Sequence, residues 1–111
     1  MKHIIAYIKP HKLDVVTQAL HQIDQLTGMT VLEVKGFGRE RKNELSPEEQ
    51  LKDFVRHYKI ELFCKNEISE EVVTAIAQSA HTGLRGDGKI YICGTQDAIR
   101  ISSGERGKVA V

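Results

Sequence analysis

The sequence predicts a single α+β domain of the ferredoxin-like class, with strands and helices in the order βαββαβ. Four stretches are rich in β-forming residues or alternate between apolar and polar residues, as strands do, and apolar residues recur at helical spacing in two others. The chain has 111 residues and no long apolar run, so residues 1–111 are expected to form one domain with one modest core. In this class two helices cover one face of one antiparallel sheet.

The first half of the chain contains a strand, a helix and a second strand. The stretch at 2–9 is rich in β-forming residues, and Pro10 ends it because proline lacks the N–H that a strand ladder needs. Apolar residues then recur at helical spacing from 12 to 24. After a turn at Gly28, alternation predicts a strand over 30–35.

The second half contains a strand, a helix and a last strand. Alternation at 57–64 predicts the third strand, whose inner face carries Tyr58, Ile60, Leu62 and Cys64. Ser69 is suited to cap a helix that continues to Ala80, because its hydroxyl can accept a backbone N–H of the first turn. Residues 89–94 form the predicted fourth strand. The strands carry apolar residues on both faces, so the face without helices predicts an oligomer.

The net charge and the cysteines limit the classes of function that the protein can have. The formal net charge is +1, which argues against nucleic-acid binding. Charged residues and a proline at 9–12 interrupt the apolar N-terminus, so a cytoplasmic protein without membrane insertion is expected. Cys64 and Cys93 lack the paired spacing of a metal or redox site and are expected to be reduced and buried. The histidines lack ligand spacing, so no metal site is predicted.

A long connection at 39–57 separates the second and third strands, where a hairpin needs roughly 2–5 residues. Ser46 and the residues after it form a helix-capping pattern, which predicts a helix of about two turns. Its apolar stripe consists of Leu51, Phe54 and Val55. This helix either binds a partner or packs on its own protein, and the sequence leaves both open.

The loop before the last strand, Gly83-x-x-x-x-Gly88-Lys89, nearly matches the phosphate-binding P-loop. Ile90 stands where the Mg²⁺-binding hydroxyl belongs, and a helix precedes the loop where a P-loop has a strand. The loop is therefore not a P-loop. Its glycines still suit close approach of backbone N–H groups to an anion.

Five blocks together resemble the nitrogen-regulatory PII signal-transduction proteins and their PII-like relatives. They are "IIAYIKPHKLDVV", "TGMTVLEVKGFGR", "KIELF", "HTGLRGDGKIYI" and "AIRISSGE", in this order along the chain. The resemblance implies a homotrimer of ferredoxin-like subunits with inward-facing sheets, adenine nucleotides between the subunits, and a long loop that contacts a partner protein. The implied ligand is ATP or ADP, with AMP as a further candidate and Mg²⁺ as a candidate companion ion.

The resemblance also implies site residues. Those matched to nucleotide binding are Gly38, Arg39, Thr30, Glu61, Phe63, Gly86, Asp87, Gly88, Lys89 and Arg100. Arg100 matches an arginine that the neighbouring subunit supplies. Between two glycines, Asp87 is also a plain turn residue. The stripe of Leu51, Phe54 and Val55 becomes the candidate partner-binding surface within the effector segment 39–57.

Three departures from typical members indicate a non-standard member of the family. Ser102 stands where a second phosphate-binding arginine is common. Glu40 and His57 replace a glutamine and a lysine that typically bind 2-oxoglutarate, so no 2-oxoglutarate binding is expected. Residues 39–57 contain no tyrosine of the kind that is modified in typical members.

The sequence thus favours a non-enzymatic, nucleotide-binding regulator of a membrane transporter or an enzyme, because no catalytic constellation is evident. One alternative is a trimeric protein that binds a small ligand or a divalent metal and is linked to metal tolerance or efflux. Another is a purely structural trimer. The glycine loop together with Arg39 and Arg100 favours the first, since a metal-binding protein does not need three cations around such a loop.

Overall fold

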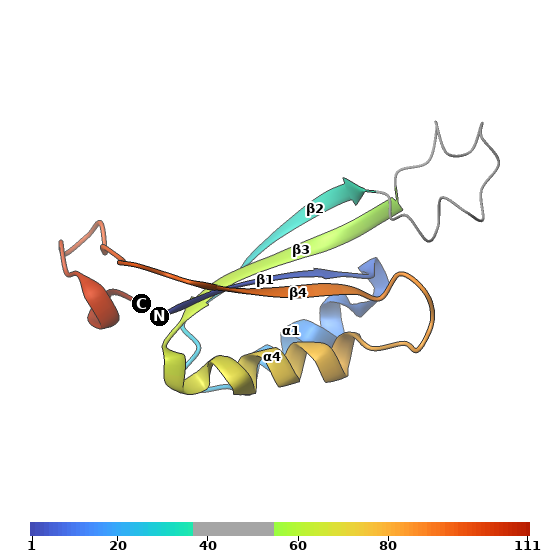
Figure 1. Cartoon of the computed structure of the whole chain (residues 1–111), viewed down its shortest axis with the longest axis horizontal. Helices are drawn as coiled ribbons and strands as arrows, with labels where there is room; N and C mark the ends of the chain where they lie inside the picture. The colour runs from blue at the N-terminus through green and yellow to red at the C-terminus, as the bar shows by residue number, and fades with distance from the viewer. Residues whose placement is uncertain (37–54) are drawn as a thin grey trace.

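The computed structural model describes residues 1–36 and 55–111, and its elements follow the expected order. Figure 1 shows the α-helices beneath a twisted sheet. The elements are β1 (Lys2–Ile8), the 3-10 helix η1 (Pro10–Lys12), α1 (Leu13–His21), β2 (Thr30–Gly36), β3 (Val55–Cys64), α4 (Asn66–Ala80), β4 (Gly88–Gly94) and the 3-10 helix η2 (Gly107–Ala110).

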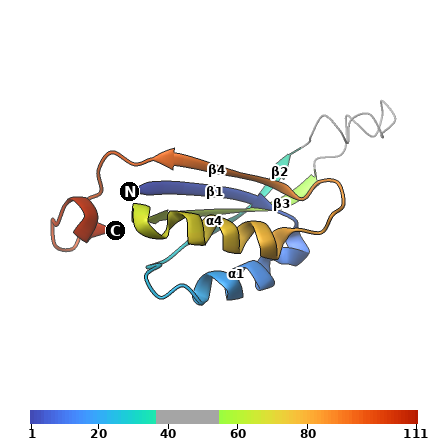
Figure 2. The same ribbon diagram turned by 60° about the horizontal axis from the view of Figure 1, so that its bottom comes forward.

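The four strands form one sheet in the order β2-β3-β1-β4, and every neighbouring pair is antiparallel. The helices α1 and α4 lie on the same face of this sheet, as the turned view in Figure 2 makes plain. This architecture confirms the ferredoxin-like α+β prediction. The central strands are β3 and β1, and the edge strands are β2 and β4.

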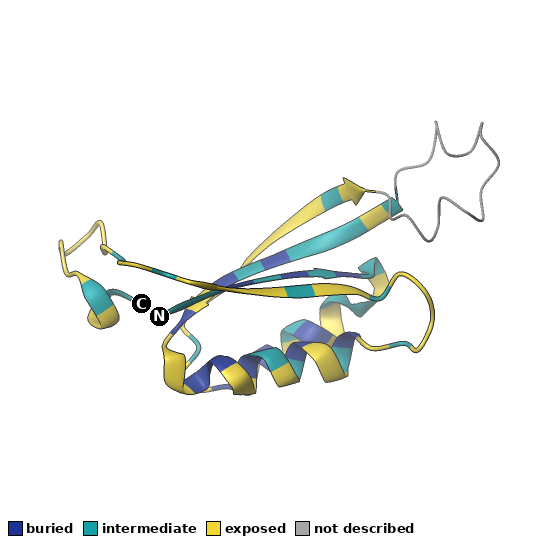
Figure 3. Ribbon diagram, in the orientation of Figure 1, coloured by how far each residue is buried: buried dark blue, intermediate teal, exposed yellow. Residues whose placement is uncertain are grey.

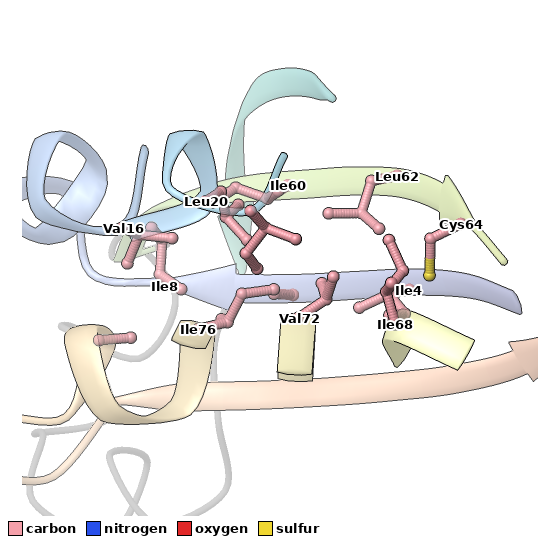
Figure 4. Close-up of a cluster of buried hydrophobic side chains, with 13 residues drawn as sticks. Ile4, Ile8, Val16, Leu20, Ile60, Leu62, Cys64, Ile68, Val72 and Ile76 are labelled. Atoms are coloured by element: carbon pink, nitrogen blue, oxygen red, sulfur yellow. The ribbon is translucent and has the colours of Figure 1, made fainter. Parts of the chain in front are cut away.

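The core fills the space between the helices and the sheet (Figure 4). The inner-face prediction for β3 is confirmed, since Ile60, Leu62 and Cys64 are at most 2 % exposed and Tyr58 packs against the cluster. The other members come from β1, the helices and the turn after α1, and they are Ile4, Ala6, Ile8, Val16, Leu20, Ile23, Ile68, Val72, Ile76 and Ala80.

Two predictions about local structure were wrong. Ser69 does not cap α4, because the helix begins three residues earlier, at Asn66. Burial of Ile68 draws the first turn onto the core, and the hydroxyl of the buried Ser69 donates instead to the carbonyl of Asn66 at 2.9 Å. Val55 was expected in a short helix, but it is the first residue of β3 and pairs with Gly36 of β2.

The prediction that Cys93 is buried was also wrong, whereas Cys64 is buried as expected. On β4, Ile90 and Ile92 pair with buried residues of β1 and therefore point toward the helices. Because side chains alternate along a strand, Cys93 points to the face without helices and is exposed.

We call the face of the sheet without helices the open face. It holds a mixture of apolar, aromatic and charged side chains, including Ile5, Tyr7, Leu32, Lys59, Phe63, Lys89 and Tyr91. Leu32, Phe63 and Tyr91 are 45 %, 45 % and 49 % exposed. Figure 3 shows that the edge strands β2 and β4 are mostly coloured as exposed.

Candidate functional site

The glycine loop that joins α4 to β4 has a backbone that only glycine adopts easily. Gly83, Gly86 and Gly88 have φ angles of 80°, 82° and 102°, all in the left-handed region. A Cβ atom on Gly88 would also overlap the carbonyl of Tyr7. The helix-then-strand flanks confirm that this loop is not a P-loop.

Asp87 closes the glycine loop on itself. Its carboxylate accepts hydrogen bonds from the backbone N–H of Thr82 at 2.9 Å and of Gly83 at 3.1 Å, and from the hydroxyl of Thr82. The hydroxyl of Thr82, followed by its N–H, holds the pKa of Asp87 well below the ordinary carboxyl value. The carboxylate therefore shapes the loop, as expected of a turn residue.

Lys9, which the sequence analysis did not single out, ties the glycine loop to the end of β1. Its ammonium donates to the hydroxyl of Thr82 at 3.0 Å and pairs with Asp87 at 3.1 Å. The Lys9 side chain is 17 % exposed, so this is a shielded ion pair. The contact joins residues 73 positions apart, which hides it from local pattern analysis.

A cleft of about 270 Å³ lies beside the loop, between the C-terminal half of α4 and the start of β4. Its walls include Asp87, Gly88 and Lys89 of the loop and strand, and Ile76 and Ala80 of α4. Within residues 1–36 and 55–111, Lys89 has no ion-pair partner, in contrast to Lys9. Among the described residues, the loop thus offers glycine backbone and, in Lys89, a cation without an ion-pair partner, a combination suited to an anion.

A second cleft, of about 330 Å³, lies where β2 begins. It brings together Thr30, Glu61 and Phe63, three of the residues matched to nucleotide binding, with residues 27–29 and the C-terminal residues 110–111. Glu61 contributes a carboxylate that only accepts hydrogen bonds, and Phe63 contributes an aromatic face.

His3 of β1 supports two walls of this second cleft. Its Nε2 lies 2.7 Å from Oε1 of Glu61, and its ring stacks on Phe63 with 4.4 Å between centroids and 12° between planes. Lys59 approaches the other oxygen of Glu61 at 3.9 Å. Sequence reasoning missed His3 because 58 positions separate it from Glu61 and only the sheet register brings them together.

Arg100 lies far from the glycine loop within one chain. Gly88 and Gly94 bound β4, so about 20 Å of extended strand separates the loop from the segment that carries Arg100. Figure 1 shows the two at opposite ends of the molecule. The guanidinium of Arg100 donates to the carbonyl of Val109 at 3.3 Å, within the C-terminal segment.

Of the remaining predicted site residues, Gly38, Arg39, Leu51 and Phe54 lie outside the described residues. The described ends of their segment are Gly36 and Val55, which pair with each other. Close to this pair, Nε2 of His57 lies 3.3 Å from the carbonyl of Gly86. The base of the long segment therefore contacts the glycine loop.

Neither a metal site nor a membrane-spanning helix is found in the parts of the chain that the structure covers. No group of three or more His, Cys, Asp or Glu side chains among residues 1–36 and 55–111 is arranged to hold a metal ion. None of the described helices is both long enough and apolar enough to cross a membrane.

Comparisons with known proteins agree with the fold. The family described as "Nitrogen regulatory protein P-II" matches residues 1–105. Over the full length of both chains, the sequence is 49 % identical to nitrogen regulatory protein P-II of Rhodospirillum rubrum and 44 % identical to nitrogen regulatory protein P-II 1 of Escherichia coli. A crystal structure of Arabidopsis thaliana PII bound to citrate superposes with a TM-score of 0.81 at 34 % identity, covering 99 % of this chain and 91 % of that one.

Proposed function

Since the chain belongs to the nitrogen regulatory protein P-II family, we propose that it is a homotrimeric regulator that binds ATP or ADP and signals through residues 39–57. Proteins of this family are signal transducers and not enzymes. The nucleotide assignment rests on one observation: a glycine loop held in shape by Asp87, with the cation of Lys89 beside it.

The glycine loop supports a phosphate site because hydrogen bonds and an ion pair within the chain hold its shape. Asp87 and Lys9 neutralise each other inside the loop, so Lys89 remains to balance a ligand's charge. A backbone that is already ordered loses little conformational entropy on binding, which favours affinity. The positive-φ glycines allow the closest approach of backbone N–H groups to phosphate oxygens.

The second cleft supports the nucleoside part of the ligand. Phe63 offers an aromatic face to a base, while Thr30 and Glu61 offer polar groups to a sugar or an exocyclic amine.

A third contribution, from Arg100, requires a second copy of the chain. About 20 Å of β4 separates Arg100 from the glycine loop, so one phosphate group cannot contact both within a single chain. A head-to-tail interface would bring Arg100 of one copy to the loop of the next, and such interfaces form a ring when the rotation between copies closes. The exposed apolar residues of the open face would be covered in that ring.

The effector arm of this proposal is the segment 39–57, with Leu51 and Phe54 as its contact surface. Its base contacts the glycine loop through His57 and Gly86. A ligand that alters the loop can therefore alter the arm, provided that it favours one state. We assign the protein to the cytoplasm and take a membrane transporter or an enzyme as the class of partner.

Calorimetric titration with ATP and with ADP, each with and without Mg²⁺, tests the proposed function. Lys89→Ala removes one charge-assisted contact and should weaken binding about tenfold. Citrate is included as a competitor, because a solved PII structure is described as bound to it. Light scattering should give a trimer. Equal affinity in Lys89→Ala, or a stable monomer at micromolar concentration, would contradict the proposal.

A further inference from the structure

We propose that His3 is a positioning residue that fixes Glu61 and Phe63 and so makes the second cleft selective for hydrogen-bond donors on the nucleoside. This inference rests on the proposed function, because the ligand is the nucleotide assigned above. It adds a residue that lines neither cleft and lies on another strand.

The sheet register places His3 where it can hold both walls. His3 pairs directly with Phe63 across β1 and β3, and Glu61 follows on the same face two residues away. Nε2 of His3 lies 2.7 Å from Oε1 of Glu61, and the side chains are 22 % and 28 % exposed. A partly shielded contact of this length is a strong hydrogen bond to a charged acceptor.

Phe63 depends on the same histidine. β2 begins at Thr30, which pairs with Glu61, so β2 contributes no residue opposite Phe63. The ring of Phe63 remains 45 % exposed, and its stacking partner among the described residues is His3. The imidazole thus sets the plane of the ring against which a base would lie.

The contacts of Glu61 determine what the cleft can recognise. His3 holds Oε1, whereas the ammonium of Lys59 is 3.9 Å from Oε2, beyond good hydrogen-bond length. Oε2 therefore has room for a further donor. A carboxylate only accepts, so its counterpart on the ligand must carry an N–H or O–H. Ribose hydroxyls and the exocyclic amine of adenine both meet this requirement.

Two substitutions separate the hydrogen bond of His3 from its stacking. His3→Gln keeps an N–H donor for Glu61 but loses the ring, whereas His3→Phe keeps a ring but loses the donor. If donation to Glu61 selects the ligand, His3→Phe should bind ATP about fivefold more weakly, and His3→Gln should retain most of the affinity. His21→Phe, at an exposed position of α1, is the matched control and should bind like the unaltered chain.

Analogues that lack one donor each provide the decisive readout. Calorimetry compares ATP with 2′-deoxy-ATP, which lacks a ribose hydroxyl, and with inosine triphosphate, which lacks the amine. The loss caused by His3→Phe should shrink for the analogue that lacks the donor bound by Glu61. Light scattering on each variant checks that the oligomer is intact.

The outcomes separate this inference from the proposed function. An equal loss for all three nucleotides, or no loss in His3→Phe, would overturn the role of His3 while ATP binding stands. A weaker His3→Gln than His3→Phe would assign the effect to stacking and also overturn the hydrogen-bond account. Absence of ATP binding by the unaltered chain would overturn the proposed function and this inference with it.

Discussion

The two clefts of the molecule are similar in volume, about 270 and 330 Å³, but they are built in different ways. The first cleft lies beside the glycine loop, whose shape is fixed by positive-φ glycines and by a carboxylate that binds backbone N–H groups. The cleft at the start of β2 owes its shape to side chains, with His3 holding Glu61 and Phe63. Substitutions at the first cleft should therefore act by straining the backbone, whereas substitutions at the second should change which ligands it selects.

The largest effect is expected for Gly88→Ala. The new Cβ would overlap the carbonyl of Tyr7 in the paired strand, and φ of 102° strains any residue with a side chain. We expect a loss of about 3 kcal/mol or more in the free energy of unfolding, measured by urea denaturation.

Gly94→Ala, at the other end of β4, is the matched control for Gly88→Ala. No atom lies within 4 Å of the place that a Cβ on Gly94 would take, and the φ of this residue is not in the left-handed region. Its unfolding free energy should stay within about 0.5 kcal/mol of the unaltered chain. Equal stability of the two variants would show that the loop relaxes around a methyl group and that the backbone does not fix this cleft.

A smaller effect is expected for Asp87→Asn, which keeps the shape of the side chain but removes its charge. The amide cannot accept from Thr82 and Gly83 and also pair with Lys9 as the carboxylate does. Nucleotide affinity should fall about tenfold, because the loop must then be ordered on binding. Faster amide exchange at 82–88 should accompany the loss. An unchanged affinity would mean that the glycines alone shape the loop.

The same carboxylate predicts a pH dependence. Because the folded pKa of Asp87 is lowered, its contribution to stability is fully present above the ordinary carboxyl pKa of about 3.9 and is lost as pH falls below it. Asp87→Asn should therefore lose less stability than the unaltered chain between about pH 4 and pH 2. Parallel acid profiles for the two proteins would contradict this assignment.

Local sequence patterns predicted the fold of this protein better than the contacts that build its two clefts. Period-two and helical spacing predicted the strands, helices and inner face, because burial of one face imposes a local pattern. The predictions that Ser69 caps a helix and that Cys93 is buried were wrong, because the start of a helix and the burial of an edge strand depend on packing against residues distant in the sequence. The contacts of Lys9 with Thr82 and of His3 with Glu61 span 73 and 58 positions, and no local pattern encodes them.

The smallest expected effect concerns 2-oxoglutarate and the contact between the glycine loop and His57. In typical members of the family a lysine at this position binds 2-oxoglutarate, whereas here an imidazole lies 3.3 Å from the carbonyl of Gly86 and 3.4 Å from that of Val55. A ring that donates to a backbone carbonyl is held by the protein, and near neutral pH an imidazole is a weaker cation than an ammonium. A dianion therefore lacks its main partner, and Glu40 adds negative charge to the segment that follows β2.

Titration of 2-oxoglutarate into the Mg-ATP-loaded protein should give no saturable heat at physiological concentrations. His57→Lys, alone and with Glu40→Gln, serves as the matched pair, and a gain of binding only in the double variant would assign the lost response to both positions. Saturable binding by the unaltered chain would show that the protein recognises 2-oxoglutarate without the lysine.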